Sequence, residues 1–377
     1  MVGSICKLPN ELMSLIFDSA HDTAAFELAN SGFDEVITRT TARTLICLLS
    51  TLLSVNRTWR HLARSLCTIW TVVPIVKELN SPFSLEDFVE RSGSRPLTLV
   101  ACMSKDELRR VFDALDPLMV LSRVHSLSIA ILRWDAGYPV FLWTVDRWNF
   151  PALKHFALSG IYLYPNLEGA WNWFTGLADQ VTSIELGTVY LPHHDGILPI
   201  IPTIPCSHLE RLTVHYYYED IAALLSNGVF PKLNVFQLRN VVTDKVPSRP
   251  LPALRLLIIE EGYSVCSRLA LALIELAPRL DCLVFLAWTG YYHENFLSRF
   301  EVGDGHASAG PIHAPSLKRL VLRDGILRKS TLQRVSQRRQ ALVYPAHEWN
   351  IQLENVQLVE DGDETLMMQL AASVSLT

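Results

Sequence analysis

One phrase recurs along the chain after about residue 95, and it constrains the fold more than any other feature. The phrase is apolar-x-x-apolar-x-apolar, and a proline often precedes it. Its alternating apolar residues predict a short strand with one face directed inward. The segments between phrases, such as 270–276, read as helices that return the chain. The phrase occurs at 124–129, 153–158, 181–186, 209–214, 233–238, 254–259, 280–285 and 317–322.

The spacing of the phrases indicates how such units would assemble. Successive phrases begin 29, 28, 28, 24, 21, 26 and 37 residues apart, and most of these intervals match the period of leucine-rich repeats, about 20–29 residues. Because one unit cannot bury its own apolar edge, neighbours are expected to stack into a parallel sheet lined by helices. The consensus asparagine of such repeats is absent, so we expect an irregular solenoid. A globular α/β domain is the alternative.

The solenoid interpretation assigns side chains to a surface that would contact a partner. Residues between the inward ones of each strand are expected on the concave face, and this face is mixed at its start, apolar from about Leu256 to Leu286, and basic at its end. A mixed surface suits protein recognition better than a phosphate backbone. The candidate target-binding residues of this face are Arg211, His215 and Arg239.

Tyrosines form a second regularity in the same region. Four residues past the last strand position, a tyrosine stands in four of the eight repeats. If strand-like alternation persists there, these rings point outward, and we expect an aromatic ledge of the kind found at binding hot spots. The alternative is that the rings cover the loop edge of the core. The four residues are Tyr162, Tyr190, Tyr218 and Tyr263.

Two apolar segments near the N-terminus predict a pair of helices, one from residue 8 to 17 and one from 52 to 66. Pro9 suits the first turn of the first helix, because its missing N–H would lack a partner there. Leu8, Leu12 and Ile16 then fall on one face at helical spacing. Two helices of this length bury only part of their apolar faces against each other, and the remainder predicts a partner site.

These segments resemble the F-box, and more narrowly the F-box of a large fungal family in which degenerate leucine-rich repeats follow the box. The resemblance implies that the module binds the Skp-type adaptor of a cullin–RING ubiquitin ligase. It is carried by Leu8-Pro9-x-Glu11-Leu12-x-x-x-Ile16-Phe17, by Val55-Asn56-Arg57-x-Trp59-Arg60-x-Leu62-Ala63 and by Ile69-Trp70. The adaptor-binding positions it implies are Leu8, Pro9, Leu12, Ile16, Val55, Trp59 and Leu62.

The expected domain organisation follows from these two regions. Residues 5–75 form the F-box-like helical module, with an insertion at about 19–47 that a compact F-box does not need. A linker follows at 76–95, the repeat domain occupies 96–360, and a tail ends the chain at 361–377. The alternative for the first region is an ordinary helical cap on a larger domain.

Bulk properties favour an intracellular protein, cytoplasmic or nuclear. Seven widely scattered cysteines include no C-x-x-C pair, which suggests reduced thiols. The first residues lack the apolar run of a secretory signal, and the longest membrane-like stretch, 45–55, is shorter than the about 20 residues that span a bilayer. We therefore expect no membrane partner. The formal net charge of −5 argues against general affinity for nucleic acid.

Catalytic and metal-binding patterns are weak, so we expect no enzyme, no cofactor and no metal. The sequence contains no G-x-S-x-G, H-E-x-x-H or P-loop motif. His193-His194-Asp195 lacks a third spaced ligand and reads as a polar loop. The basic run 328–339 reads as the solvated side of a helix, with nucleic-acid binding as its alternative; the acidic stretch 354–364 is a candidate to lie against it.

The resemblance and the repeats together imply a substrate-receptor subunit of a cullin–RING (SCF-type) ubiquitin ligase. The helical module would bind the adaptor and the repeats would hold an unidentified target protein, which raises the effective concentration of its lysines near the conjugating enzyme. Two alternatives remain. One is a repeat-based interaction scaffold whose helices are only a cap, and the other is a cryptic hydrolase that uses the region of His193.

Overall fold

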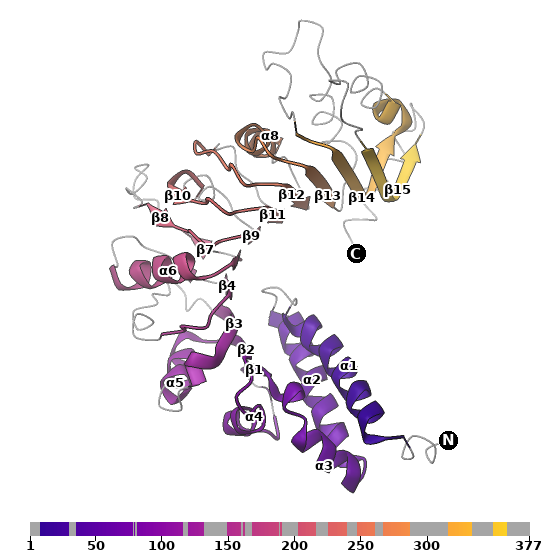
Figure 1. Ribbon diagram of the computed structural model, residues 1–377, viewed down its shortest axis with the longest axis vertical. Helices are drawn as coiled ribbons and strands as arrows, with labels where there is room; N and C mark the ends of the chain where they lie inside the picture. The colour runs from indigo at the N-terminus through magenta and orange to yellow at the C-terminus, as the bar shows by residue number, and fades with distance from the viewer. Residues whose placement is uncertain are drawn as a thin grey trace, which may run out of the picture. The chain divides into compact units, whose positions relative to one another are not determined.

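The chain has an α/β structure with a large parallel sheet and a helical N-terminal region, as the computed structural model shows (Figure 1). The chain divides into two compact units, which are described separately. The first comprises Met1–Leu177 with Gly187–Pro192, and the second Ala178–Leu186 with His193–Thr377. The structure describes residues 8–29, 35–77, 79, 81–115, 120–131, 149–159, 161–162, 168–187, 189–190, 203–215, 225–239, 247–260, 267–286, 316–333 and 350–359.

The first unit begins with helices and continues with parallel strands. Helix α6 (Glu168–Gln180) contains the boundary with the second unit. The helical elements of the first unit are α1 (Asn10–Ala29), α2 (Glu35–Ser54), α3 (Arg57–Ser65), η2 (Cys67–Trp70), α4 (Leu85–Arg91), α5 (Lys105–Leu115) and η4 (Val120–Arg123). Its strands are β1 (Val72–Val76), β2 (Leu97–Met103), β3 (Val124–Ile131), β4 (His155–Ser159), β5 (Ile161–Tyr162) and β7 (Val189–Tyr190).

The second unit is dominated by strands of the parallel sheet. Its elements are β6 (Ser183–Leu186), β8 (Ile204–Pro205), β9 (Arg211–His215), β10 (Gly228–Val229), β11 (Val235–Arg239), β12 (Leu256–Glu260), α8 (Ser267–Leu276), β13 (Cys282–Leu286), β14 (Arg319–Arg328) and β15 (Asn350–Val359). In Figure 1, α8 lies beside the strands β12 and β13, which precede and follow it in the chain.

The prediction of a single second helix from 52 to 66 is wrong, because the chain breaks between α2 and α3. Asn56 has an extended backbone (φ −160°), and its side chain accepts a hydrogen bond of 2.8 Å from the N–H of Trp59. This is an N-cap, which starts a new helix at Arg57. Arg60 Nε donates to the carbonyl of Leu53 at 2.8 Å and so satisfies a free carbonyl at the end of α2.

The expected insertion at 19–47 lengthens α1 and α2 to 20 residues each. Its described residues are helical and carry small and aliphatic side chains into the core. Leu28 of α1 and Leu45 of α2 are buried in one cluster with Val72 and Val100 of the strands. The second half of α1 and the middle of α2 thus pack against β1 and β2. The F-box-like residues at the start of α1 and after the end of α2 are not part of this cluster.

The segment 76–95, expected as a linker, contains the short helix α4. Ser84 and Asp87 form a reciprocal capping box at its start. Phe88 packs edge-on against the fully buried Trp70, with ring centroids 5.5 Å apart, and the guanidinium of Arg91 lies 4.4 Å from the centre of the Trp70 ring. Trp70 is therefore the point where η2 and α4 join.

The strands of both units are parallel and follow chain order. In the first unit the order is β1-β2-β3-β4, and β5 pairs separately with β7. In the second the order is β6-β9-β11-β12-β13-β14-β15, and β8 pairs with β10. Each of the eight phrases runs into one of these strands, so the predicted parallel strands are confirmed.

One helix has the length and composition to cross a membrane among the residues that the structure describes, the part of α2 from Val36 to Ser54. The apolar stretch expected at 45–55 lies mostly within this helix. The same helix buries Ala42, Leu45 and Leu49 completely, and a core helix satisfies the same criterion of length and apolarity. These three buried side chains of α2 are packed inside the first unit.

Candidate protein-interaction surfaces

The seven adaptor-binding candidates lie on α1, on α3 and on the residues next to them, and none is fully buried. Leu12, Ile16 and Val55 expose 47%, 49% and 45% of their surface. We call the set the docking face. Its members are the exposed Pro9, Leu12, Ile16 and Val55 and the half-buried Leu8, Trp59 and Leu62. Leu15, on the same side of α1, is 63% exposed.

The opposite side of α1 fixes the orientation of this face. Met13 and Phe17 are buried, and the Phe17 ring packs edge-on against Trp59 with centroids 5.0 Å apart. Aromatic pairs prefer this geometry. Helix α1 would expose Met13 and Phe17 if it rotated to cover Leu12 and Ile16, so the apolar docking face is maintained by the core beneath it.

Hydrogen bonds hold α3 and η2 in place beside α1. The indole N–H of Trp70 donates to the carbonyl of Ala63 at 2.8 Å, and both residues are buried. Thr68 Oγ1 donates to Asp18 Oδ1 of α1 at 2.5 Å. Trp59 Nε1 is also buried but has no hydrogen-bond partner in the described part of the chain. The docking face therefore lies on a helical scaffold with fixed internal contacts.

A buried histidine lies on α1 one turn beyond Phe17. His21 is 2% exposed, and neither ring nitrogen forms a hydrogen bond with a described residue. Its Nδ1 lies 3.6 Å from Asp22 Oδ1, which is beyond hydrogen-bonding distance. Burial lowers the pKa of His21 below its ordinary value, and this effect outweighs the nearby carboxylates of Asp22 and Asp18.

A second surface is formed by alternate residues of β6, β9 and β11 to β15 in the second unit, which we call the outward face of the sheet. Leu257 and Ile259 of β12 are buried on the other side, whereas Leu256 and Ile258 are half-buried on the outward face. Val284 of β13 is half-buried beside them, so β12 and its neighbour follow the expected alternation and the expected apolar stretch. On the flanking strands the outward-face residues Thr213, Gln237 and Val321 are buried.

Two of the three polar target-binding candidates are engaged in pairs within the chain. His215 is buried, and its Nε2 lies 2.7 Å from Glu185 Oε1 on the neighbouring strand β6. Arg239 Nε lies 2.9 Å from Glu260 Oε2 on β12. Sequence reasoning missed both partners. The signal was present, because Arg239 and Glu260 occupy the same position of consecutive phrases and face each other in register.

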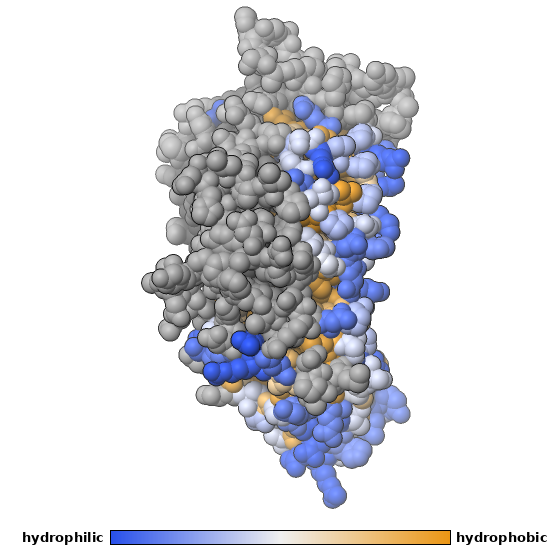
Figure 2. All heavy atoms as spheres, turned by 90° about the vertical axis from the view of Figure 1, so that its left-hand side faces the viewer, coloured by the Kyte–Doolittle hydropathy of each residue, from blue (hydrophilic) through white to orange (hydrophobic). Residues whose placement is uncertain are grey.

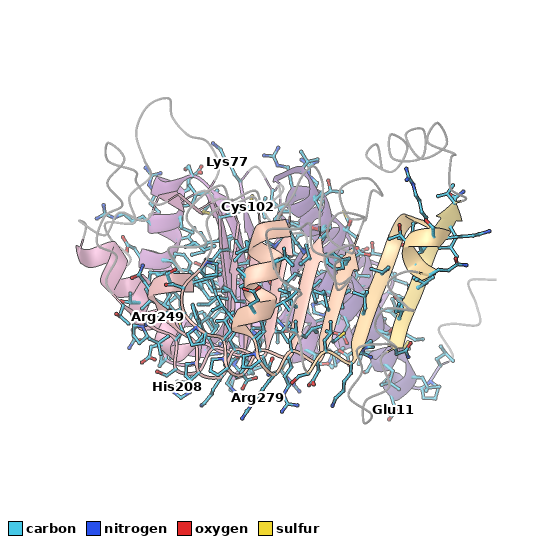
Figure 3. All side chains as sticks on the ribbon, turned by 90° about the horizontal axis from the view of Figure 1, so that it is seen from above. Glu11, Lys77, Cys102, His208, Arg249 and Arg279 are labelled. Atoms are coloured by element: carbon cyan, nitrogen blue, oxygen red, sulfur yellow. The ribbon has the colours of Figure 1, made fainter. Side chains whose placement is uncertain are left out.

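Arg211, the third candidate, is exposed at the start of β9. Arg319 holds the equivalent position at the start of β14 and is also exposed; its Nε donates to Cys282 Sγ at 3.2 Å. Figure 3 shows the edge of the second unit where the strands begin, with His208, Arg249 and Arg279 at that edge. Among the described residues of this unit, several basic side chains thus lie near the amino ends of the strands.

The tyrosine ledge is described only in part. Tyr162 and Tyr190 belong to β5 and β7, where they are register partners in a parallel pair. This pairing shows that the backbone is extended at Ile161–Tyr162 and at Val189–Tyr190, which is the condition that the expected ledge requires. The side chains of both residues, and Tyr218 and Tyr263 entirely, lie outside the described residues, so the ledge stays a prediction.

The described residues contain no group of three or more His, Cys, Asp or Glu side chains that could hold a metal ion. Burial raises the pKa of the Cys206 thiol to about 12, so this cysteine is not an activated nucleophile. His193-His194-Asp195 and residues 334–339 of the basic run lie outside the described part. At the start of that run, Arg328 ends β14 and residues 329–333 are helical, as predicted for the run.

Figure 2 shows a face of the molecule on which the described apolar residues lie between hydrophilic ones. The coloured residues of this face do not form a broad apolar area. Comparisons with known proteins add no family: no model of a known protein family matches the sequence, and no curated protein matches it.

Proposed function

We propose that the chain is a substrate-receptor subunit of a cullin–RING ubiquitin ligase of the SCF type. The docking face binds the Skp-type adaptor, and an irregular leucine-rich-repeat solenoid binds a target protein. The contribution to ubiquitin transfer is proximity, because a held target presents its lysines to the conjugating enzyme at high effective concentration. The chemistry itself belongs to other subunits.

The observation that supports this proposal is the exposure of the docking face. Leu12, Ile16 and Val55 match apolar positions of the F-box pattern, and about half of each side chain is exposed to solvent. Leaving adjacent aliphatic side chains in water is unfavourable unless a partner covers them. The arrangement of the strands agrees with a repeat protein, since parallel strands in chain order are what stacked strand–helix units produce.

The packing of the long helices favours a second candidate, the interaction scaffold. Ala24 and Leu28 of α1 and Ala42 and Leu45 of α2 cover side chains of β1, β2 and β3. Covering the first strands of a repeat array is what a terminal cap does. The two candidates differ in one respect: a cap needs no adaptor, whereas a substrate receptor binds one through the docking face.

Co-purification with a Skp-type adaptor separates the candidates. The test variant is Val55→Glu, which places a carboxylate in the docking face. Its matched control is Val229→Glu on β10, where the side chain is 42% exposed, close to the 45% of Val55. We expect the wild type and Val229→Glu to retain the adaptor and Val55→Glu to lose at least 90% of it, roughly the effect of a tenfold or larger loss of affinity.

Circular dichroism of the same samples shows whether each variant is folded. Retention of the adaptor by folded Val55→Glu at the wild-type level would contradict the proposed docking face. Failure of the wild type to bind any Skp-type adaptor would favour the scaffold. A proteasome inhibitor applied in cells during the same purification would enrich bound targets if these are degraded.

A further inference from the structure

One row of residues crosses the outward face of the second unit where its strands begin. The register pairs Arg211 with Val235, Val235 with Leu256, Leu256 with Cys282, and Cys282 with Arg319. We call these five residues the arginine-bounded row. Its centre is apolar: Val235 and Leu256 are half-buried and Cys282 is buried, while the arginine at each end is exposed.

The two arginines differ from the other arginines of the outward face in lacking a carboxylate. Arg239 pairs with Glu260, and Arg323 pairs with Glu354. In the described part of the chain, neither Arg211 nor Arg319 forms an ion pair, although Arg319 contacts the Cys282 thiol. A guanidinium binds a carboxylate through two parallel hydrogen bonds. Arg211 can offer Nε and a terminal nitrogen, and Arg319, whose Nε donates to Cys282, can offer its two terminal nitrogens.

The length of the row sets the spacing of a matching ligand. Arg211 and Arg319 are separated by four steps between neighbouring strands, each about 4.8 Å, or about 19 Å in total. An extended peptide lying across the strands advances about 3.3 Å per residue, so about six residues cover this distance. Side chains an even number of residues apart point to the same side of an extended chain. Positions i and i+6 can therefore both face the sheet.

We propose that the arginine-bounded row binds an extended target segment with acidic residues at i and i+6 and aliphatic residues at i+2 and i+4. The carboxylates pair with Arg211 and Arg319, and the aliphatic side chains lie over Val235, Leu256 and Cys282. An apolar centre between charged ends is the usual composition of a protein interface. The inference rests on the proposed function for its biological meaning, since it specifies the signal that the receptor recognises.

Fluorescence anisotropy with the full chain tests this inference. The probe is a labelled seven-residue peptide with aspartate at both ends, leucine at the third and fifth positions and serine elsewhere. We expect saturable binding that Arg211→Ala and Arg319→Ala each weaken at least tenfold. Arg279→Ala is the matched control, because Arg279 is an exposed arginine in the turn before β13, outside the row; it should bind as the wild type does.

A second peptide tests the register. Moving the final aspartate one position inward turns it to the opposite side of the extended chain, and we expect at least a tenfold loss of affinity. Equal binding of the two peptides, or binding unaffected by both arginine variants, would overturn the inference. Displacement by a single-stranded oligonucleotide as readily as by unlabelled peptide would also overturn it in favour of a nucleic-acid surface.

The proposed function has a separate readout in these samples. Arg211 and Arg319 are not part of the docking face, so adaptor co-purification should be unchanged in both variants. If these variants lose peptide binding but retain the adaptor, the result supports the arginine-bounded row as a peptide site separate from the docking face. If the wild type retains the adaptor but does not bind the peptide, the inference fails and the proposed function does not.

Discussion

His21 lies on α1 with both ring nitrogens buried and without a hydrogen bond to any described residue. A protonated ring at this position would be a buried charge, which explains why the pKa is lowered. The unfolded chain, in which the pKa returns to about 6.5, binds the proton more readily. The stability due to neutral His21 is therefore fully present above the pKa of the unfolded state, about 6.5. It is lost as the pH falls from that value through the lower pKa of the folded state.

Replacement of His21 by leucine should remove this pH dependence. We expect the free energy of unfolding of the wild type to fall between pH 7.5 and 5.5, and that of His21→Leu to fall less over the same interval, because leucine binds no proton. Urea denaturation followed by tryptophan fluorescence measures both. His61→Leu, a change at an exposed histidine of α3, should keep the wild-type pH dependence. A wild-type slope in His21→Leu would show that other groups cause it.

Among the elements, those with a local pattern could be predicted and those defined by distant contacts could not. The eight apolar phrases predicted eight strands, because the alternation that buries one face of a strand is present in its own sequence. These strands are β3, β4, β6, β9 and β11 to β14. The break at Asn56 was missed, although asparagine is a strong N-cap, because apolar residues continue at helical spacing on both sides of it. By contrast, helical spacing alone was sufficient to place Leu12 and Ile16 on one face of α1.

Three strands of the large parallel sheet were missed for identifiable reasons. β1 is apolar throughout and contains Pro74, which a strand at the edge of the sheet tolerates because it need not donate on its outer side. β2 is buried on nearly every residue, because helices α1 and α2 cover its second face. In β15 the alternation is interrupted at Asn355, which has a positive φ of 54°. The docking of the long helices on these strands depends on contacts that no local pattern encodes.

Arg123 connects two elements of the first unit and gives a prediction at this scale. Its guanidinium donates to Ser92 Oγ at 2.7 Å and to the carbonyl of Arg95 at 2.9 Å, both in the segment between α4 and β2. We expect Arg123→Ala to lower the free energy of unfolding by about 2 kcal/mol, since hydrogen bonds from a charged donor are lost. Arg109→Ala, at an exposed ion pair on α5, should cost less than about 0.5 kcal/mol.

Denaturation of the two arginine variants under one condition makes the comparison direct. Similar losses of stability in both would mean that the contacts of Arg123 contribute no more than an exposed ion pair. Retention of most of the stability in Arg123→Lys would assign the effect to charge alone, because lysine cannot donate to two acceptors with the same planar geometry.

At the scale of the whole molecule, the order of the strands limits where a ligand can bind. Doubly wound α/β sheets bind small molecules in the crevice where the strand order reverses. Within each unit, the described strands of the sheet follow chain order without a reversal. The described part of the chain thus lacks that type of crevice, and its distinctive features are surfaces: apolar helices in the first unit and the arginine-bounded row in the second.

The central claim is that the docking face binds a Skp-type adaptor, and isothermal titration calorimetry with the purified adaptor tests it most directly. The account predicts saturable one-to-one binding with a negative heat-capacity change, because apolar side chains leave water on association. Ile16→Glu should weaken binding about a hundredfold or more, and Val229→Glu should not. Absence of binding heat from the wild type at several temperatures, or unchanged binding by Ile16→Glu, would contradict the account.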